Sequence, residues 1–254
     1  MSALIFDCDG VLADTEQYGH LPAFNRMFKE FNLPVQWSEA EYGVKLKIAG
    51  GKERISSLLT PEFITSAGLP HDPETLKVLV ARWHQRKTQI YKQMVMEGLL
   101  PGRPGVRRVV QEALDAGWQL AVASTSAVES VRSVLDFTLG KDLASAFAVL
   151  AGDMVTKKKP APDIYLLALE KLGVSPHEAL VVEDSRNGLL AATAAGMHCV
   201  VTLSSYTWSE DMQEAILVVS DLGEEDQPMQ VISNHSKAQP QSYIRLKDLE
   251  ACLN

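Results

Sequence analysis

The sequence predicts an α/β fold, a doubly wound parallel sheet that carries a separate helical domain. From about residue 100 onward, short apolar runs alternate with segments of helical period, which is the rhythm of βαβ units. Residues 15–98 instead show helical patterns and no convincing strand. An all-helical block inserted after the first strand of such a sheet indicates a cap domain. We therefore expect a core of residues 1–14 and 99–254 and a cap of residues 15–98.

The first strand is predicted at residues 3–6, an apolar run that stops at Asp7. The predicted cap follows, and its clearest element is the long amphipathic stretch of residues 74–96. Apolar residues recur along this stretch with helical spacing, which predicts that they face the interior of the cap: Leu76, Leu79, Val80, Trp83, Ile90 and Met94.

Strands and helices alternate through the rest of the predicted core. The Pro and Gly residues at 101–105 open a helix through residue 116, and Gly117 ends it. Apolar runs predict further strands at residues 118–123, 147–151, 179–182 and 198–201. Helical spacing predicts helices at residues 163–172, 189–195 and 246–253. The polar segment 223–243 carries no predicted element.

Composition excludes several function classes. The chain of 254 residues is 46% hydrophobic and 22% charged, which is ordinary for a globular protein. No apolar run approaches the ~20 residues of a membrane span, and the first residues show no targeting leader, so we expect no membrane partner. The net charge of −8 argues against nucleic acid. The three cysteines are far apart, so they indicate neither a zinc site nor a disulfide framework and fit a reducing compartment.

Two carboxylates, Asp7 and Asp9, followed by Gly10, end the first predicted strand. A buried carboxylate is costly unless a cation or hydrogen-bond donors meet it. The pair therefore favours a divalent metal with oxygen ligands, and one carboxylate could act as a nucleophile. The alternative is an Asx turn after a surface strand. Cys8 is expected to be a buried apolar filler, because neighbouring carboxylates raise the pKa of a thiol.

Polar residues follow the other predicted strands as well: Ser124-Thr125, Lys159 before Pro160, and Glu183-Asp184. Ligands of an open parallel sheet bind at the carboxyl ends of its strands, so we expect these residues to converge. Carboxylates, a hydroxyl and a lysine around one point indicate Mg²⁺ and a phosphate group. The basic run 157–159 on an acidic protein suits a small anionic ligand, although a solvated loop would have the same composition.

These motifs resemble, in order, the four motifs of the haloacid dehalogenase (HAD) superfamily. Residues 7–12 resemble motif I, Ser124 motif II, Lys159 with Pro160 motif III, and residues 183–185 motif IV. The match covers nearly the whole chain, and the helical insert resembles the C1 cap of the phosphoglucomutase-like subgroup. Residues 14–20, 50–54 and 157–160 are similar to the CbbY group of xylulose-1,5-bisphosphate phosphatases, especially its plant and algal form.

The resemblance implies a HAD-type Rossmann-like core and an aspartyl-phosphate mechanism. Asp7 would be the nucleophile, and Asp9 would act first as the acid and then as the base. The carboxylates of Asp7 and Asp184 and the main-chain carbonyl of Asp9 would hold Mg²⁺. Glu183 would support the metal site, although it could instead form a structural pair with a lysine.

Motifs II and III would bind the transferred phosphoryl group. Lys159 would neutralise the phosphoryl oxygens and the charge of the nucleophile. Ser124 and Thr125, before the following helix, would grip the same group. The plain alternative for Ser124 is a helix N-cap.

The cap would select the substrate. Gly50 and Gly51 would allow close approach of the backbone to an anion, and two basic groups would suit phosphates at both ends of a sugar. The resemblance implies these substrate-binding residues in the cap: Glu16, His20, Gly50, Gly51, Lys52, Arg54 and Lys87. A plain turn, exposed cations at a helix start and, for His20, an ordinary helix position are the alternatives.

Together these expectations predict a Mg²⁺-dependent phosphatase, a monomer that converts xylulose-1,5-bisphosphate to xylulose-5-phosphate. In a plant or alga the resemblance implies the chloroplast stroma, and otherwise the cytoplasm. The rivals are a β-phosphoglucomutase-like phosphotransferase and another small sugar-phosphate phosphatase. The chain has one residue more between Asp14 and His20 than the usual mutase pattern, which argues against mutase geometry. Asp9 argues against a dehalogenase, and the intact motif carboxylates argue against a catalytically dead scaffold.

Overall fold

A computed structural model describes residues 2–48, 50–152 and 154–253. The chain forms two compact units, one of residues 1–15 and 100–254 and one of residues 16–99. We call the first unit the core and the second the cap. Each boundary is one residue later than the sequence predicts.

The core contains a seven-stranded sheet with the strand order β3-β2-β1-β4-β5-β6-β7. Neighbouring strands are parallel except β6 and β7, which are antiparallel. The predicted parallel α/β fold is thus confirmed, but β6 and β7 were not predicted. The strands are β1 (Ala3–Phe6), β2 (Gln119–Ala123), β3 (Phe147–Leu150), β4 (Ala179–Glu183), β5 (His198–Thr202), β6 (Leu217–Val219) and β7 (Val231–Asn234).

The strand order places a topological switch point between β1 and β4. The chain proceeds from β1 outward through β2 and β3 on one side, and from β4 outward through β5 on the other. At such a point the connections leave in opposite directions, which opens a crevice at the carboxyl ends of the two strands. Asp7 follows β1 directly, and Glu183 is the last residue of β4.

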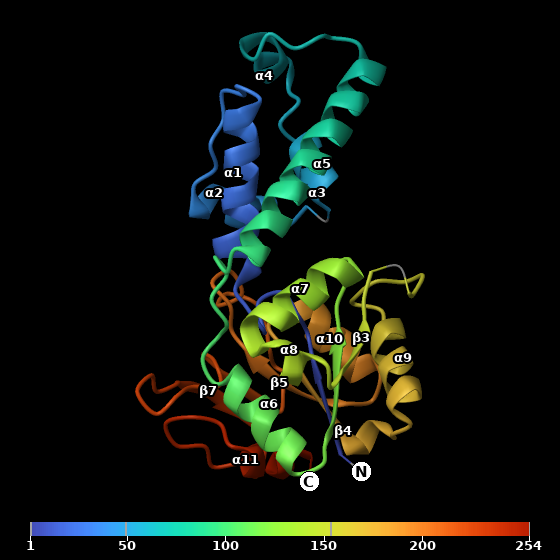
Figure 1. The fold of residues 1–254 in the computed structure, drawn as a ribbon, viewed down its shortest axis with the longest axis vertical. Helices are drawn as coiled ribbons and strands as arrows, with labels where there is room; N and C mark the ends of the chain where they lie inside the picture. The colour runs from blue at the N-terminus through green and yellow to red at the C-terminus, as the bar shows by residue number, and fades with distance from the viewer. Residues whose placement is uncertain (1, 49, 153, 254) are drawn as a thin grey trace. The chain divides into compact units, whose positions relative to one another are not determined.

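Helices cover both faces of the sheet (Figure 1). On one face, Ile164 of α9 and Leu189 of α10 join a buried cluster with Ile5 and Val181 of the strands. The alternate strand residues point to the opposite face, where α6, α7 and α11 contact the sheet. The helices of the core are α6 (Val106–Asp115), α7 (Val128–Leu139), α8 (Lys141–Ala144), α9 (Asp163–Leu172), the short 3₁₀ helix η2 (Pro176–Glu178), α10 (Arg186–Ala194) and α11 (Leu246–Leu253).

Local capping explains where α9 and α10 begin and end. α9 has its predicted bounds and stops at Gly173, whose φ of 65° is the left-handed conformation that favours glycine. α10 begins three residues before its predicted start. The reason is Ser185, whose side chain accepts a hydrogen bond from the main-chain N–H of Gly188 and so serves as the N-cap.

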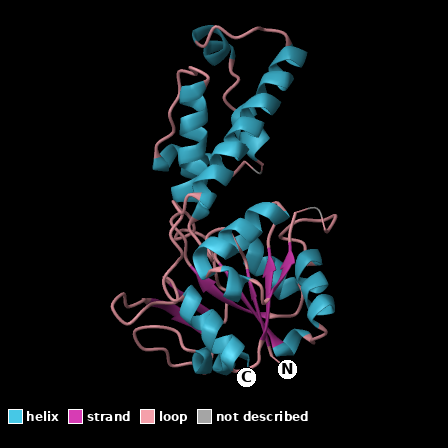
Figure 2. Ribbon diagram, in the orientation of Figure 1, coloured by secondary structure: helices cyan, strands magenta, loops and turns pink. Residues whose placement is uncertain are grey.

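The described part of the cap consists of helices and loops, as Figure 2 shows. Its longest helix is α5, which begins after Asp72, because the carboxylate of Asp72 accepts a hydrogen bond from the main-chain N–H of Thr75. The elements are the π-helical turn η1 (Glu16–His20), α1 (Leu21–Glu30), α2 (Glu39–Lys45), α3 (Gly51–Ser56), α4 (Pro61–Ser66) and α5 (Pro73–Met96).

The buried face of α5 differs from the predicted one at two places. Leu76 and Leu79 are only partly buried, because the first turns of α5 extend beyond the packed interior of the cap. Lys87 is buried, although a lysine was not expected on the inner face. The buried residues of α5 are Val80, Trp83, Lys87, Ile90, Tyr91, Met94 and Val95. Among the described helices, none has the length and apolar character that a bilayer crossing requires.

The polar segment 223–243 docks on the core through main-chain contacts. It contributes β7, which pairs antiparallel with β6. The guanidinium of Arg108 on α6 donates to the carbonyls of Gly223 and Ile244, both at 2.6 Å. This long-range anchoring explains how a segment of polar composition is ordered.

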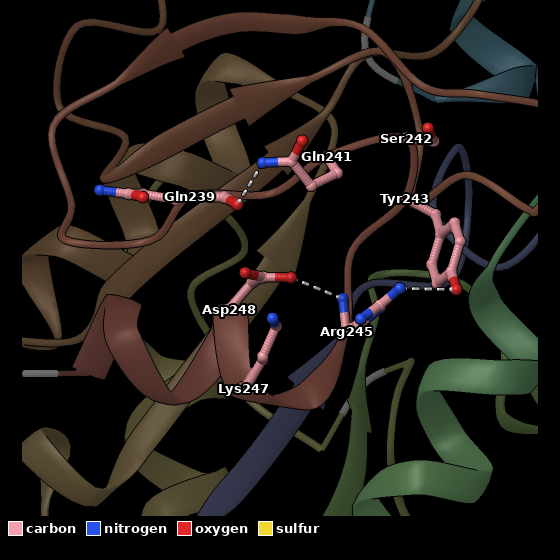
Figure 3. A pocket seen from close by; sticks show the side chains of 7 residues that line it. All are labelled: Gln239, Gln241, Ser242, Tyr243, Arg245, Lys247 and Asp248. Atoms are coloured by element: carbon pink, nitrogen blue, oxygen red, sulfur yellow. Dashed lines mark hydrogen bonds between the residues drawn. The ribbon is translucent and has the colours of Figure 1, made fainter.

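A pocket of about 70 Å³ lies where this segment meets α11 (Figure 3). The guanidinium of Arg245 donates to the hydroxyl of Tyr243 at 3.0 Å, and the carboxylate of Asp248 accepts from the main-chain N–H of Arg245 at 2.9 Å. Polar groups of the pocket thus already bond to one another. The lining contains no predicted site residue and consists of Gln239, Gln241, Ser242, Tyr243, Arg245, Lys247 and Asp248.

Candidate active site

Asp7 and Lys159 form a buried ion pair at the carboxyl end of β1. Nζ of Lys159 lies 2.6 Å from Oδ1 of Asp7, 2.6 Å from Oε1 of Glu183 and 2.8 Å from the carbonyl oxygen of Ala123. The three donors of the ammonium group therefore all have acceptors. The structure thus brings together residues from motifs I, III and IV, which the sequence predicts to converge.

The carboxylate of Glu183 is surrounded by hydrogen-bond donors. Oε1 accepts from Lys159 and from the hydroxyl of Tyr165, each at 2.6 Å. Oε2 accepts from the main-chain N–H of Asp184 at 3.1 Å and from the hydroxyl of Ser185 at 3.3 Å. Sequence reasoning did not find Tyr165, because it occupies an ordinary inner position of α9. Its one signal is a polar hydroxyl on an otherwise apolar helix face.

Burial and mutual repulsion shift the protonation of this cluster. Burial raises the pKa of Asp7 to about 7, and the nearby carboxylates of Glu183 and Asp9 act in the same direction. Burial also raises the pKa of Asp184 well above its usual range, reinforced by Glu183 and Asp7. For Lys159, burial lowers the pKa, but the attraction of Asp7 and Glu183 outweighs it and raises the pKa above its ordinary value.

Asp7, Glu183 and Asp184 are arranged to hold a metal ion. All three are buried, and each offers an oxygen within 4.8 Å of the others. The raised pKa values of Asp7 and Asp184 express the lost solvation and the like-charge repulsion that a cation would relieve. Because both oxygens of Glu183 already accept hydrogen bonds, we expect Asp7 and Asp184 to supply the direct ligands. A set of carboxylate oxygens suits Mg²⁺.

The carboxylate of Asp9 lies between two hydroxyl groups. Oδ1 accepts from Oγ1 of Thr15 at 2.6 Å, and Oδ2 accepts from Oγ of Ser126 at 2.5 Å. The buried hydroxyl of Ser124 accepts from the main-chain N–H of Ser126 at 3.0 Å and so shapes the turn after β2. Sequence reasoning missed Ser126 and Thr15 as partners of Asp9. The signal available for Ser126 was its place in the Ser-Thr-Ser run after a strand.

The residues next to Ser124 and Lys159 do not all point into the buried cluster of carboxylates. Thr125 is exposed. Ala127, not Ser124, is the N-cap of α7, so the N-cap alternative for Ser124 is wrong. In the basic run, Lys157 is exposed and Lys158 donates to the carbonyl of Gly152. Lys159 contacts the carboxylates of Asp7 and Glu183.

Cys8 is a buried filler, as predicted. It is 1% exposed. Burial raises the pKa of its thiol well above the ordinary value, and the carboxylates of Asp9 and Asp7 add to the shift. The thiol is therefore a poor nucleophile at neutral pH.

In the cap, Glu16 and Arg54 meet at the hydroxyl of Tyr42. This hydroxyl donates to Oε2 of Glu16 at 2.5 Å and accepts from Nη1 of Arg54 at 2.9 Å. The same Nη1 lies 3.6 Å from Oε2 of Glu16, and Nε of Arg54 donates to the carbonyl of Ile48 at 3.0 Å. The guanidinium is thus held in place by the cap's own residues.

His20 and Lys87 form a second polar pair in the cap. Nζ of the buried Lys87 lies 2.7 Å from Nδ1 of His20 and 4.5 Å from the ring centre of Phe24. The ring of His20 packs against Tyr91 with 4.1 Å between ring centres. Burial lowers the pKa of His20 well below its usual range, and the charge of Lys87 lowers it further. His20 is therefore neutral, and its Nδ1 accepts from the ammonium group.

Neighbouring side chains pack closely against Gly50 and Gly51 at the start of α3. Gly50 has a φ of 93°, and a Cβ on it would lie 2.0 Å from Oε2 of Glu53. A Cβ on Gly51 would lie 2.9 Å from Nε2 of His84. The positive φ favours glycine at residue 50, and a side chain at residue 51 would require the ring of His84 to move. Lys52, the next residue, is exposed.

A π-helical turn lies where the sequence predicts one residue more than the mutase pattern. Residues 16–20 form this turn, and α1 continues from Leu21. A π turn closes with one residue more than an α turn, so it accommodates a one-residue insertion without displacing the helix that follows.

Comparison with known proteins identifies the family. A family model described as haloacid dehalogenase-like hydrolase matches residues 1–196. The chain belongs to the haloacid dehalogenase-like hydrolases. Within them it is CbbY-like. It is 45% identical to a CBBY-like protein of Arabidopsis thaliana over 227 residues, which cover 88% of this chain and 70% of the relative. It is 41% identical to the plasmid-encoded CbbY of Cupriavidus necator over 233 residues, 90% of this chain and 89% of the relative.

A solved structure agrees with this assignment. The crystal structure of an aspartate-to-asparagine variant of CbbY from Rhodobacter sphaeroides, in complex with xylulose-1,5-bisphosphate, matches with a TM-score of 0.71 and 34% identity. The match covers 87% of this chain and 94% of that one. The HAD fold expected from the four motifs is thereby confirmed.

Gly188→Ala should abolish activity although alanine normally favours a helix. A Cβ at residue 188 would lie 1.8 Å from Oε1 of Glu183, so either α10 or the carboxylate must move. Alanine usually stabilises a helix by about 0.5–1 kcal/mol relative to glycine, but here the substitution should lower the stability of the folded protein. The control is Gly173→Ala, where nothing lies within 4 Å of the added Cβ and φ is 65°. It should lower Tm slightly and leave hydrolysis of a phosphate ester unchanged. Equal activity of the two variants would contradict the argument.

Mg²⁺ should stabilise the protein more at pH 8 than at pH 6. The folded-state pKa of Asp7, about 7, exceeds that of an unfolded aspartate, about 3.9, so its stabilising contribution is present at low pH and lost as pH rises through about 7. A cation restores it by binding the deprotonated group. At a hundredfold excess over Kd, binding contributes about 2.7 kcal/mol, which corresponds to roughly 5–10 °C in Tm.

The measurement is the difference in Tm between Mg²⁺ and EDTA at the two pH values. In Asp7→Asn the difference in Tm between Mg²⁺ and EDTA should be small at both pH values. An equal difference at pH 6 and pH 8 in the unsubstituted protein would refute the assignment of the shifted group.

Proposed function

We propose that the protein is a Mg²⁺-dependent phosphatase that converts xylulose-1,5-bisphosphate to xylulose-5-phosphate. As a CbbY-like member of the HAD hydrolases, it acts on phosphorylated sugars. The observation that carries the proposal is the pair of aspartates after β1. Asp7 contacts the ammonium group of Lys159, whereas Asp9 contacts only neutral hydroxyls among its described side-chain partners. Two carboxyls in unlike surroundings suit the two roles of a nucleophile and an acid.

In the first step, a carboxylate oxygen of Asp7 attacks the phosphorus atom. The bond between phosphorus and the sugar oxygen breaks, and the carboxyl group of Asp9 gives its proton to that oxygen. The products are the sugar with a free hydroxyl and an aspartyl-phosphate on Asp7. The hydroxyls of Ser126 and Thr15 orient the carboxyl group of Asp9 for this transfer.

In the second step, water hydrolyses the aspartyl-phosphate. Asp9 takes a proton from the attacking water, the bond between phosphorus and the Asp7 oxygen breaks, and inorganic phosphate leaves. Lys159 stabilises negative charge on the phosphoryl oxygens, and its contacts with Glu183 and the Ala123 carbonyl keep it in position. We expect Ser124 and Thr125 to bind the same oxygens.

The carboxylates of Asp7 and Asp184 and the main-chain carbonyl of Asp9 would hold Mg²⁺, with Glu183 in support. When bound, the ion offsets the repulsion between the anionic nucleophile and the anionic substrate. The buried carboxylate cluster and the raised pKa values of its members support this assignment.

The cap residues are proposed to select a sugar with two phosphates. Arg54 and Lys87 are already held in the cap by Tyr42 and His20, so their charges are preorganised. Lys52 is exposed and follows Gly50 and Gly51, where its ammonium group is accessible to an anion. A bound xylulose-1,5-bisphosphate in the related CbbY structure supports a bisphosphate as substrate. Glu16, in the same cap cluster, is proposed to bind a sugar hydroxyl.

The place of action follows from the same resemblance. A CBBY-like relative occurs in a plant, Arabidopsis thaliana. We propose the chloroplast stroma for a plant or algal protein and the cytoplasm otherwise.

Phosphate release from xylulose-1,5-bisphosphate should require Mg²⁺ and be lost in Asp7→Asn, because an amide cannot form the aspartyl-phosphate. Asp136→Asn is a matched control at an exposed position of α7 and should retain full activity. A colorimetric assay of released phosphate, with and without EDTA, measures the Mg²⁺ requirement and the activity of each variant. Equal or greater turnover of β-glucose-1-phosphate to glucose-6-phosphate would instead favour the mutase.

Lys52→Ala should raise KM for the bisphosphate far more than for a small monophosphate. A hydrogen bond to a charged group contributes about 1.5–3 kcal/mol, so the expected rise is roughly ten- to hundredfold. Lys77→Ala, at an exposed position of α5, should change neither constant. Steady-state kinetics with both substrates decide the question, and an equal change in the two KM values would remove Lys52 from the specificity argument.

A further inference from the structure

The guanidinium of Arg103 binds four main-chain carbonyls at the edge of the candidate active site. Nη1 donates to the carbonyl oxygen of Gly10 and, at 3.0 Å, to that of Thr202. Nη2 donates to the carbonyls of Leu203 at 2.7 Å and Ser220 at 2.6 Å. One side chain thus ties the loop after β1 to the ends of β5 and β6.

The guanidinium of the half-buried Arg103 bonds to neutral oxygens. Among the described residues, no carboxylate forms an ion pair with it, although removing a guanidinium from water without one is costly. Burial lowers the pKa of Arg103, while the charges of Asp184, Asp14 and Asp221 raise it. The side chain therefore remains a cation that faces carbonyl dipoles, and it lies within the field of a predicted metal ligand, Asp184.

Arg103 also lies where the chain returns from the cap. Its main-chain N–H donates to the carbonyl of Leu12 at 2.9 Å, and Gly102 forms a β-bridge with Ala13. The N–H of Gly10 donates to the carbonyl of Ala13 at 2.8 Å. Both polar groups of Gly10 are consequently restrained, the N–H by Ala13 and the carbonyl by Arg103.

The position of Gly10 connects these contacts to the metal site. Gly10 follows Asp9, whose main-chain carbonyl is a proposed ligand, and the peptide between them moves with Gly10. A Cβ on Gly10 would lie 2.0 Å from Oδ2 of Asp184, so the backbone here packs directly against the other ligand. The φ of Gly10 is 86°, a left-handed conformation that favours glycine.

We propose that Arg103 is a positioning residue for the metal site. By holding the carbonyl of Gly10 against the ends of β5 and β6, it keeps the main-chain carbonyl of Asp9 and the carboxylate of Asp184 directed at one point. The inference rests on the proposed Mg²⁺-dependent function and assigns a role to a residue outside the four motifs. It follows that loss of the guanidinium weakens metal binding before any substrate is present.

Arg108 provides a matched control. It lies on α6, and its guanidinium also donates to main-chain carbonyls, those of Leu222, Gly223 and Ile244. These contacts dock the segment 223–243 and include no residue of the candidate site. Arg108→Gln should therefore lower the stability of the protein as Arg103→Gln does, but it should not weaken Mg²⁺ binding.

The experiment titrates metal-free protein with MgCl₂ by calorimetry, without substrate, for the unsubstituted protein and for Arg103→Gln, Arg103→Lys and Arg108→Gln. Removal of a group that orients metal ligands typically weakens affinity 10- to 100-fold, which is the effect expected for Arg103→Gln. Lysine keeps the charge but cannot span the carbonyls with a planar fork, so Arg103→Lys should recover only part of the affinity. Arg108→Gln should lower Tm and leave the Kd for Mg²⁺ unchanged.

Steady-state kinetics on the same proteins provide a second readout. For Arg103→Gln, the Mg²⁺ concentration for half-maximal rate should rise with Kd, while KM for the sugar phosphate at saturating Mg²⁺ should change less than about threefold. A purely structural role would lower the active fraction and leave the Mg²⁺ dependence unmoved.

Three results would overturn the proposal: unchanged Mg²⁺ affinity in Arg103→Gln, an equal loss in Arg108→Gln, or full recovery in Arg103→Lys. If Arg103→Gln does not fold, the comparison of Arg103→Lys with Arg108→Gln still decides. The unsubstituted protein tests the proposed function separately. Mg²⁺ binding without hydrolysis of the bisphosphate would remove the substrate assignment and leave the result for Arg103 intact.

Discussion

The contact of Lys159 with Asp7 and Glu183 is the interaction on which the site depends. Three carboxylates, those of Asp7, Glu183 and Asp184, lie buried within a few ångströms of one another, and like charges in a poorly solvated environment repel strongly. One ammonium group at 2.6 Å from two of them offsets part of that repulsion. A second cation would stabilise the remaining negative charge. An ion of the size and charge of Mg²⁺ therefore suits the cluster.

The sheet topology turns this cluster into a site with two distinct acids. The switch point brings the ends of β1 and β4 together, so Asp7 meets the charged residues of motifs III and IV. Asp9, two residues later, is turned toward the loop after β2, where it meets the hydroxyl of Ser126. Identical side chains thereby acquire different neighbours, a cation for one and hydroxyls for the other. The proposed division into nucleophile and acid follows from that difference.

The cap holds two of its cationic side chains in place through its own residues. The guanidinium of Arg54 is held by Tyr42, and the ammonium group of Lys87 lies against His20 and the ring of Phe24. Holding long cationic side chains in place beforehand reduces the conformational entropy lost on binding. The π-helical turn of residues 16–20 places His20 directly before α1.

The sequence by itself determined the elements whose signals are local. The apolar runs of β1, β2, β4 and β5, the helical period of α9 and α11, and the four motifs could all be read directly, because each depends on neighbouring residues. Only the tertiary structure decided β6 and β7, the burial of Lys87, and the partners of Asp9 and Gly10. The hydroxyl of Ser126 reaches Asp9 across 117 residues, and Arg103 reaches Gly10 across 93. Such contacts depend on how distant segments pack, and no local pattern encodes that.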